Sequence, residues 1–163
     1  MKEMKELLFN SSLGLRFSVN QVVLEIIRFM EADQKRRYKI TIGTDSLLLS
    51  NKQADFVTAI VVHRVGNGGR YFWRRIELGK FYNLRDRIIK EVMISLEAAQ
   101  KLLEEFQKFK AVDFDFEIHA DIGEKGPTKA MMQEVVGMIR AYNFEPKTKP
   151  MSYAASNVAD RHV

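Results

Sequence analysis

The chain has 163 residues, of which 46% are hydrophobic and 29% charged, which is typical of one globular domain with a core large enough to be stable alone. It contains no cysteine, so disulfides and thiolate zinc sites are excluded, and any metal would be held by oxygen, which favours Mg²⁺ or Mn²⁺. The net charge of +5 is compatible with a polyanionic partner, and the lack of a membrane span or signal peptide makes the cytoplasm the expected location.

Residues 1–37 are predicted to form a helical extension before the core. The first 15 residues have little pattern, after which Ser18 or Asn20 can cap a helix with apolar residues at spacings of three and four. No Pro/Gly/Ser-rich linker and no repeat divides the chain. Residues 1–163 are therefore interpreted as a single domain with its core at 38–163.

The stretch 38–46 predicts the strand around which the core is arranged. Ile40 and Ile42 share one face of this strand, and Gly43 and Asp45 share the other. Because glycine leaves the backbone bare, an ion, water or substrate can approach the Asp45 carboxylate closely.

Two further strands are predicted at 56–63 and 71–76, joined by a glycine-rich turn at 65–69. The glycines could also cradle a phosphate, but no helix and no Gly-Lys-Ser/Thr follow, so a hairpin turn is favoured. The three strands are expected to form an antiparallel meander.

A long helix follows, capped by Asn83 and carrying an apolar stripe to Phe106. Glu91 lies one residue off that stripe and Glu97 lies on another edge. Either carboxylate can point toward the strand ends, although most helical glutamates are simply exposed.

The stretch 114–121 alternates apolar and polar residues and ends at Asp121, so it predicts a fourth strand. A helix at 131–139, an edge strand at 144–149 broken by Pro146, and a terminal helix at 152–163 are expected next. Because ligands bind where parallel strands end, Asp45 and Asp121 are expected to be neighbours.

The predicted order is an N-terminal helix followed by β-β-β-α-β-α-β-α. This is an α/β fold of the ribonuclease-H-like topology, with a five-stranded mixed sheet, three antiparallel strands and then parallel strands, flanked by helices.

Five blocks of sequence carry a resemblance to a known family. They are IGTDS at 42–46, TAIVVHR at 58–64, GGRYFW at 68–73, EIHADIG at 117–123 and YAASNVADRH at 153–162. Together they closely resemble the YkuK family of bacterial proteins, which are regarded as ribonuclease-H-like and predicted to be nucleases.

This resemblance implies metal-dependent hydrolysis of phosphodiester bonds in RNA or DNA. The implied catalytic and metal-binding carboxylates are Asp45, Glu91, Asp121 and Asp160, with Glu97 as a rival for the helix position. Two Mg²⁺ or Mn²⁺ ions would relieve the repulsion between such carboxylates and activate a water.

Several other residues are candidates for supporting roles. Ser46, His119 and His162 are possible auxiliary residues, and each histidine can equally be a hydrogen-bonded structural residue. A basic group that could contact nucleic acid comprises Arg64, Arg70, Arg74, Lys147 and Lys149.

The alternative function is a non-catalytic nucleic-acid-binding or scaffold protein that retains the fold. In that case Tyr71, Phe72 and Trp73 could stack bases, or simply pack in the core.

Overall fold

The fold is built on one mixed sheet whose strand order is β2-β1-β5-β4-β3-β6-β7. The computed structural model describes residues 7–162, without the side chains of residues 155, 156 and 160. At the centre, β3 (Tyr38–Leu48), β4 (Ala54–Arg64) and β5 (Gly69–Leu78) form the predicted antiparallel meander. The α/β class and the mixed sheet are confirmed.

The predicted number of five strands is wrong, because the sheet has seven. The two additional strands, β1 (Leu8–Ser11) and β2 (Arg16–Ser18), form a hairpin that pairs with β5. Each strand is too short to show an alternating pattern, which is why no strand was predicted in this part of the sequence. Pairing along β5 and burial of Phe9 hold the hairpin in place.

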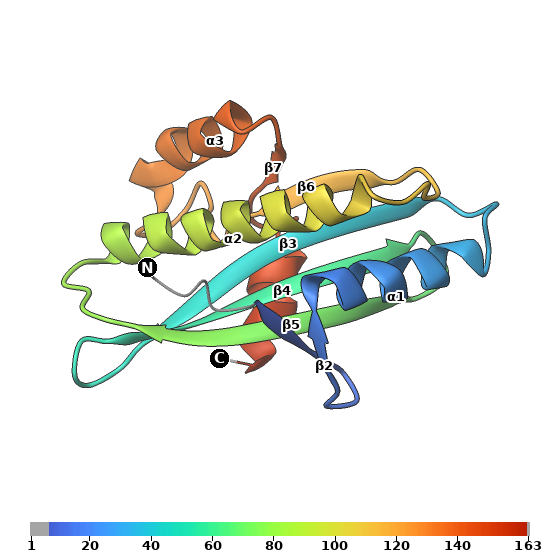
Figure 1. Ribbon diagram of the computed structural model, residues 1–163. Coiled ribbons are helices and arrows are strands. Elements are labelled where there is room, and N and C mark those ends of the chain that lie inside the picture. Colours follow the sequence, from blue (N-terminus) through green and yellow to red (C-terminus); the bar gives the residue numbers. More distant parts are fainter. Residues whose placement is uncertain (1–6, 163) are drawn as a thin grey trace.

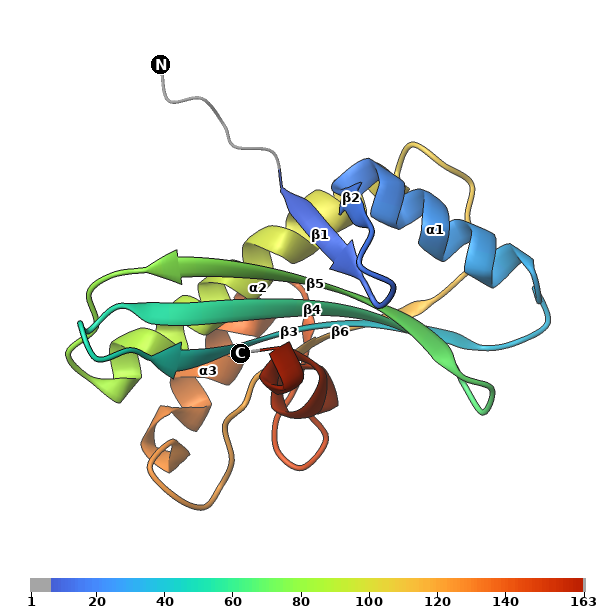
Figure 2. The ribbon, with the colours of Figure 1, turned by 90° about the horizontal axis from the view of Figure 1, so that it is seen from below.

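Helices cover the two faces of the sheet unequally. The helices α1 (Val19–Glu31) and α2 (Leu84–Phe106) lie side by side on one face, as Figure 1 shows. The opposite face carries the C-terminal segment, seen in front of the strands in Figure 2. No helix within residues 7–162 is both long and apolar enough to cross a membrane.

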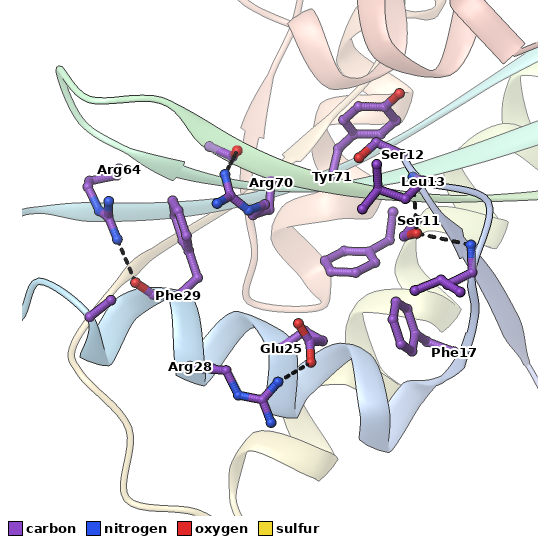
Figure 3. A pocket seen from close by; sticks show the side chains of 14 residues that line it. Ser11, Ser12, Leu13, Phe17, Glu25, Arg28, Phe29, Arg64, Arg70 and Tyr71 are labelled. Atoms are coloured by element: carbon purple, nitrogen blue, oxygen red, sulfur yellow. Dashed lines mark hydrogen bonds and ion pairs between the residues drawn. The ribbon is translucent and has the colours of Figure 1, made fainter.

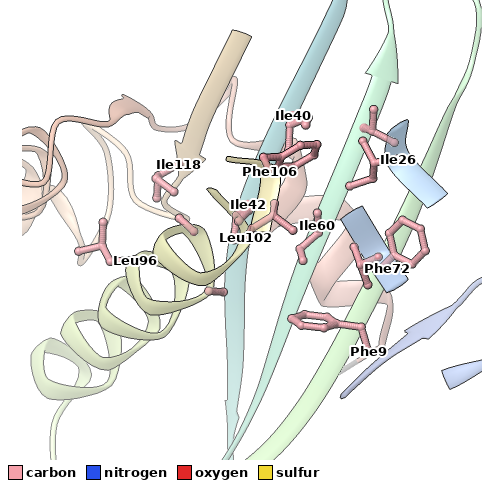
Figure 4. Packing of buried hydrophobic residues seen from close by; sticks show 14 of the residues in the cluster. Phe9, Ile26, Ile40, Ile42, Ile60, Phe72, Leu96, Leu102, Phe106 and Ile118 are labelled. Atoms are coloured by element: carbon pink, nitrogen blue, oxygen red, sulfur yellow. The ribbon is translucent and has the colours of Figure 1, made fainter. Parts of the chain in front are cut away.

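The core lies between the sheet and the two helices α1 and α2. Side chains of the sheet and of both helices meet there (Figure 4), and most are fully buried because both layers present apolar faces to each other. The labelled members of this cluster are Phe9, Ile26, Ile40, Ile42, Ile60, Phe72, Leu96, Leu102, Phe106 and Ile118.

The C-terminal half adds β6 (Asp115–His119), the 3₁₀ turn Lys129–Met131, α3 (Met132–Ala141) and β7 (Glu145–Lys147). Strand β6 runs parallel to β3, as expected, but it ends at His119, so Asp121 lies in the loop beyond it. The short β7 is an edge strand, as Pro146 indicated.

The predicted terminal α-helix is replaced by a π-helical segment, η2 (Ala154–Ala159), and a 3₁₀ turn, η3 (Asp160–His162). Small side chains allow the wider turn, and the buried Ala154 and Ala159 pack closely against the sheet. The segment therefore crosses the strands instead of standing off from them.

Ser18 is the N-cap of α1, and its replacement gives a first prediction. Its hydroxyl accepts from the Gln21 amide at 3.3 Å, and its own amide donates to Gln21 Oε1 at 2.8 Å. Ser18→Ala is expected to reduce the free energy of unfolding by about 1 kcal/mol in urea titrations, because one helix-end donor loses its partner. Ser12→Ala, in the exposed β1–β2 turn, is the control and should be near neutral.

Candidate active site

Strand β3 delivers two polar residues at its carboxyl end. Asp45 and Ser46 are half-buried, and because they are adjacent they point to opposite faces of the sheet. The Asp45 carboxylate accepts the Ser46 amide at 2.9 Å. Ser46 lies on the face covered by α2, where its hydroxyl donates to Glu91 Oε1 at 2.8 Å.

A chain of buried hydroxyls fixes α2 on the strands next to this point. The Thr44 hydroxyl lies 2.7 Å from that of Ser95 and 3.0 Å from that of Thr58. Ser95 is one helical turn after Glu91, so the same face of α2 carries both residues. These contacts set the rotation of α2 that turns Glu91 toward the end of β3.

Glu91 is the buried carboxyl group of the site, with only 5% of its surface exposed. The pKa of Glu91 is raised from 4.5 to about 8, mainly by burial and also by the nearby charges of Asp45 and Asp121, against the lowering effects of the Ser46 hydrogen bond and of Arg87. Glu97 is exposed and pairs with Lys101 at 3.2 Å. The structure thus brings Glu91, and not Glu97, to the two aspartates.

Strand β6 ends at His119, which is in register with Gly43 of β3. Asp121 lies two residues after His119, and Asp45 lies two residues after Gly43. Because the two strands are parallel neighbours, the two aspartates leave the sheet at the same edge. The carboxylate of Asp121 is half-buried and lies 3.4 Å from the Lys149 ammonium. The loop holding it is tied to the neighbouring strand segment by the Lys149 amide, which donates to the Ile122 carbonyl at 2.8 Å.

Asp160, the fourth predicted carboxylate, begins η3, and its side chain lies outside the described residues. Among the side chains that are described, no three His, Asp or Glu residues are arranged to hold a metal ion together. The donor chemistry nonetheless fits a hard cation, because Asp45, Glu91 and Asp121 offer oxygen ligands in one electrostatic cluster.

Both ring nitrogens of His119 form hydrogen bonds within the fold. Its Nδ1 accepts the Ala154 amide at 3.1 Å, so Nε2 carries the proton and donates to Glu117 Oε1 at 3.2 Å. Burial lowers the pKa of His119, against the effect of Glu117. The imidazole therefore fastens the start of η2 to β6.

Glu117 is itself buried, at 7% exposure, and it is the centre of a charged group on the η2 face of the sheet. Lys39 lies 3.6 Å from it and Lys147 lies 3.8 Å from it. The predicted nucleic-acid contact Lys147 is thus engaged with a buried carboxylate.

His162 lies flat on the indole of Trp73, with ring centroids 4.3 Å apart and an interplanar angle of 8°. Its pKa is lowered by burial and by the charges of Arg161 and Arg75. Arg75 donates to the His162 carbonyl at 2.7 Å. The histidine therefore sits on β5, two strands away from Asp45.

Arg64 and Arg70 lie at the other end of the sheet from the carboxylates. They line a cleft of about 720 Å³ between α1, the β1–β2 turn and β5, in which the Phe29 ring lies between their guanidinium groups (Figure 3). Arg64 donates to the Phe29 carbonyl at 2.7 Å and to the Tyr38 hydroxyl at 2.9 Å. Arg74 is half-buried on the α2 face, near Glu97.

Comparison with known proteins shows the family of the chain. A family model described as "Ribonuclease H-like" matches residues 21–163. The chain is also 33% identical over 153 residues to "Uncharacterized protein YkuK" of Bacillus subtilis (strain 168), a match that covers 86% of this chain and 88% of that protein. The chain belongs to the ribonuclease H-like family, within the YkuK group. No solved structure matches it.

In this ribonuclease H-like chain, two features of the site were not predicted from sequence. One is the hydroxyl chain of Thr44, Thr58 and Ser95, for which the only signal was a serine one turn from Glu91. The other is the burial of Glu117, whose alternating position in the strand predicted only a polar face. The first depends on how α2 covers one face of the sheet, and the second on the C-terminal segment that covers the other face.

Proposed function

We propose that the chain is a metal-dependent nuclease that hydrolyses phosphodiester bonds of RNA or DNA at the carboxyl edge of β3 and β6. The proposed catalytic and metal-binding residues are Asp45, Glu91 and Asp121, with Asp160 as a fourth. The observation that carries the proposal is the buried Glu91 carboxyl group, whose pKa is raised to about 8 by burial and by two neighbouring aspartates. Placing a buried carboxyl group near two other carboxylates is unfavourable for stability, so such an arrangement is typical of a functional site.

The residues of the chain would act as follows. Asp45 and Asp121 hold negative charge at the mouth of the site, where both are half-buried. Ser46 keeps the Glu91 carboxyl group turned toward them through its 2.8 Å hydrogen bond. In the metal-free protein Glu91 retains its proton at neutral pH, and it releases that proton when positive charge enters the cluster. Mg²⁺ or Mn²⁺ bound there would offset the carboxylate charge, activate a water and stabilise the leaving oxygen.

The test is a titration of Mg²⁺ and Mn²⁺ with labelled single-stranded, duplex and RNA–DNA hybrid substrates. Cleavage that requires the divalent cation and stops with a chelator supports the nuclease. Asp45→Asn serves as the variant that distinguishes this activity from a contaminant. No cleavage of any substrate at any metal concentration would reject the proposal.

One observation favours the alternative, a nucleic-acid-binding protein without turnover. The Lys149 ammonium lies 3.4 Å from the Asp121 carboxylate, so it neutralises part of the negative charge to which a metal ion would bind. Lys149 is also about half exposed, so in the nuclease it must move aside when the cation binds.

Lys149→Met distinguishes the two functions. In the nuclease, loss of the competing ammonium is expected to tighten Mn²⁺ binding several-fold, as measured by calorimetry, because Asp121 is released. In the binding protein, it is expected to weaken oligonucleotide binding and to reduce the salt slope by about one. Lys125→Met, in the exposed loop before α3, is the matched control and should change neither quantity.

A further inference from the structure

An aromatic surface lies on the same face of the sheet as Asp45. Tyr71 and Trp73 alternate along β5, both are partly exposed, and the ring of His162 covers the indole. Tyr71 also contacts that imidazole, at 5.7 Å between ring centroids. We call Tyr71 and Trp73 the aromatic platform.

The register of the strands places the platform opposite the carboxylates. Across β3, β4 and β5, one row of opposed residues is Asp45, Val57 and Arg75. The row two residues away is Gly43, Ala59 and Trp73. These residues share a face because directly opposed positions in an antiparallel pair point the same way. Two strand spacings, about 10 Å, separate the platform from β3.

The platform is bordered by positive charge and open space. Arg16 and Arg75 are exposed, and both line a hollow of about 480 Å³ beside Trp73. Arg161 is exposed in η3, next to the stacked His162. A flat aromatic surface among arginines matches a ligand with a planar ring and a negatively charged backbone.

The placement of His162 identifies the kind of group that fits. A neutral planar heterocycle lies parallel to the indole at stacking distance, which is the geometry that a nucleobase adopts on tryptophan. Its Nε2 atom is buried and has no hydrogen-bond partner among the described residues. The imidazole is therefore held by stacking on Trp73 and by the Arg75 contact to the His162 carbonyl.

We infer that Trp73 stacks a nucleobase of single-stranded nucleic acid, and that His162 holds the place of that base in the free protein. The inference deepens the proposed nuclease function and rests on it for the chemical class of the ligand. In a duplex both faces of an internal base are covered by its neighbours, so the indole selects unpaired bases. The substrate class is therefore single-stranded RNA or DNA.

The sequence offers a direct reporter of this stacking, because Trp73 is its one tryptophan. Full-length Asp45→Asn protein in chelator is titrated with oligothymidylate of about ten nucleotides, and the tryptophan emission is recorded. Emission is expected to be quenched in a saturable way. An abasic oligomer of equal length is expected to bind through its phosphates without quenching, and a blunt duplex is expected to quench far less. Equal quenching by the abasic oligomer or by the duplex would overturn the inference.

Substitutions test the same claim by anisotropy of a labelled oligomer. Trp73→Ala is expected to raise the Kd about tenfold, and Trp73→Phe, which keeps an aromatic face, only a few-fold. Tyr142→Ala removes an exposed aromatic at the C-cap of α3 and should leave the Kd unchanged. If Trp73→Phe binds as weakly as Trp73→Ala, or Tyr142→Ala weakens binding as much, the assignment is wrong.

His162→Ala is expected to lower the Kd a few-fold, since the base no longer competes with the imidazole. A rise comparable to that of Trp73→Ala would mean that the imidazole belongs to the binding surface and is not displaced. Base-dependent quenching without any metal-dependent cleavage would support base stacking on Trp73 and reject the nuclease. Metal-dependent cleavage without such quenching would support the nuclease and reject base stacking on Trp73.

Discussion

Replacing Asp45 with Asn is expected to reduce metal-dependent cleavage by about 10³-fold, because a ligand charge lost next to the reacting phosphate removes several kcal/mol of transition-state stabilisation. The change is nearly isosteric, and the amide oxygen can still accept the Ser46 amide, so the fold should persist. Single-turnover cleavage at saturating Mn²⁺ measures the effect, and unfolding curves of both proteins establish that the variant is folded.

Glu97→Gln is the control that the structure provides. Glu97 is exposed on α2 and pairs with Lys101, away from the three clustered carboxylates. Its cleavage rate should stay within about twofold of the wild type, as for surface substitutions in general. A loss at Glu97 equal to that at Asp45 would place the reaction elsewhere on the molecule.

Glu91→Gln is expected to remove a large part of the pH dependence of stability in the metal-free protein. The pKa of Glu91 is about 8 in the folded state and 4.5 ordinarily, so the unfolded chain releases the proton first as pH rises. The favourable contribution is complete below pH 4.5, declines as pH increases, and is lost above pH 8. The upper bound on this change is on the order of 5 kcal/mol, since each pKa unit corresponds to about 1.4 kcal/mol.

Urea unfolding between pH 5 and 9 in the presence of chelator measures this dependence. Relative to wild type, Glu91→Gln should become more stable as pH rises, because glutamine keeps the Ser46 hydrogen bond and carries no ionisable group. Glu97→Gln should follow the wild-type curve. Parallel curves for wild type and Glu91→Gln would show that Glu91 ionises normally and that the cluster is not electrostatically coupled.

The sequence predicted the central elements of the sheet well because their patterns are long. Strand β3 alternates apolar and polar residues from Tyr38 to Ile42, β4 is nearly continuously apolar from Phe56 to Val62, and the glycines between β4 and β5 leave a turn as the simplest connection. The cap of α1 at Ser18 was also identifiable, since serine with glutamine three residues later is a local signal. Short elements carry no such signal, and the β1–β2 hairpin was missed for that reason.

The apolar stripe of α2 shows where local patterns are insufficient. Met93 is apolar and lies within this helix, yet it is 43% exposed, whereas Ala98, Ala99 and Leu102 are buried. The rotation of the helix is set by its packing on the sheet, which includes the hydroxyl contact between Thr44 and Ser95, residues 51 positions apart. No helical periodicity contains that information.

The sequence by itself determined that β3 to β7 form, that β3 and β6 end near acidic residues, and that oxygen would be the main ligand of any metal, because these properties follow from residue type and period. Only the tertiary structure decided that Glu91 and not Glu97 faces the aspartates, that Lys149 pairs with Asp121, and that His162 stacks on Trp73. These contacts join elements distant in the chain, so they depend on how the layers pack and not on the pattern within any one element.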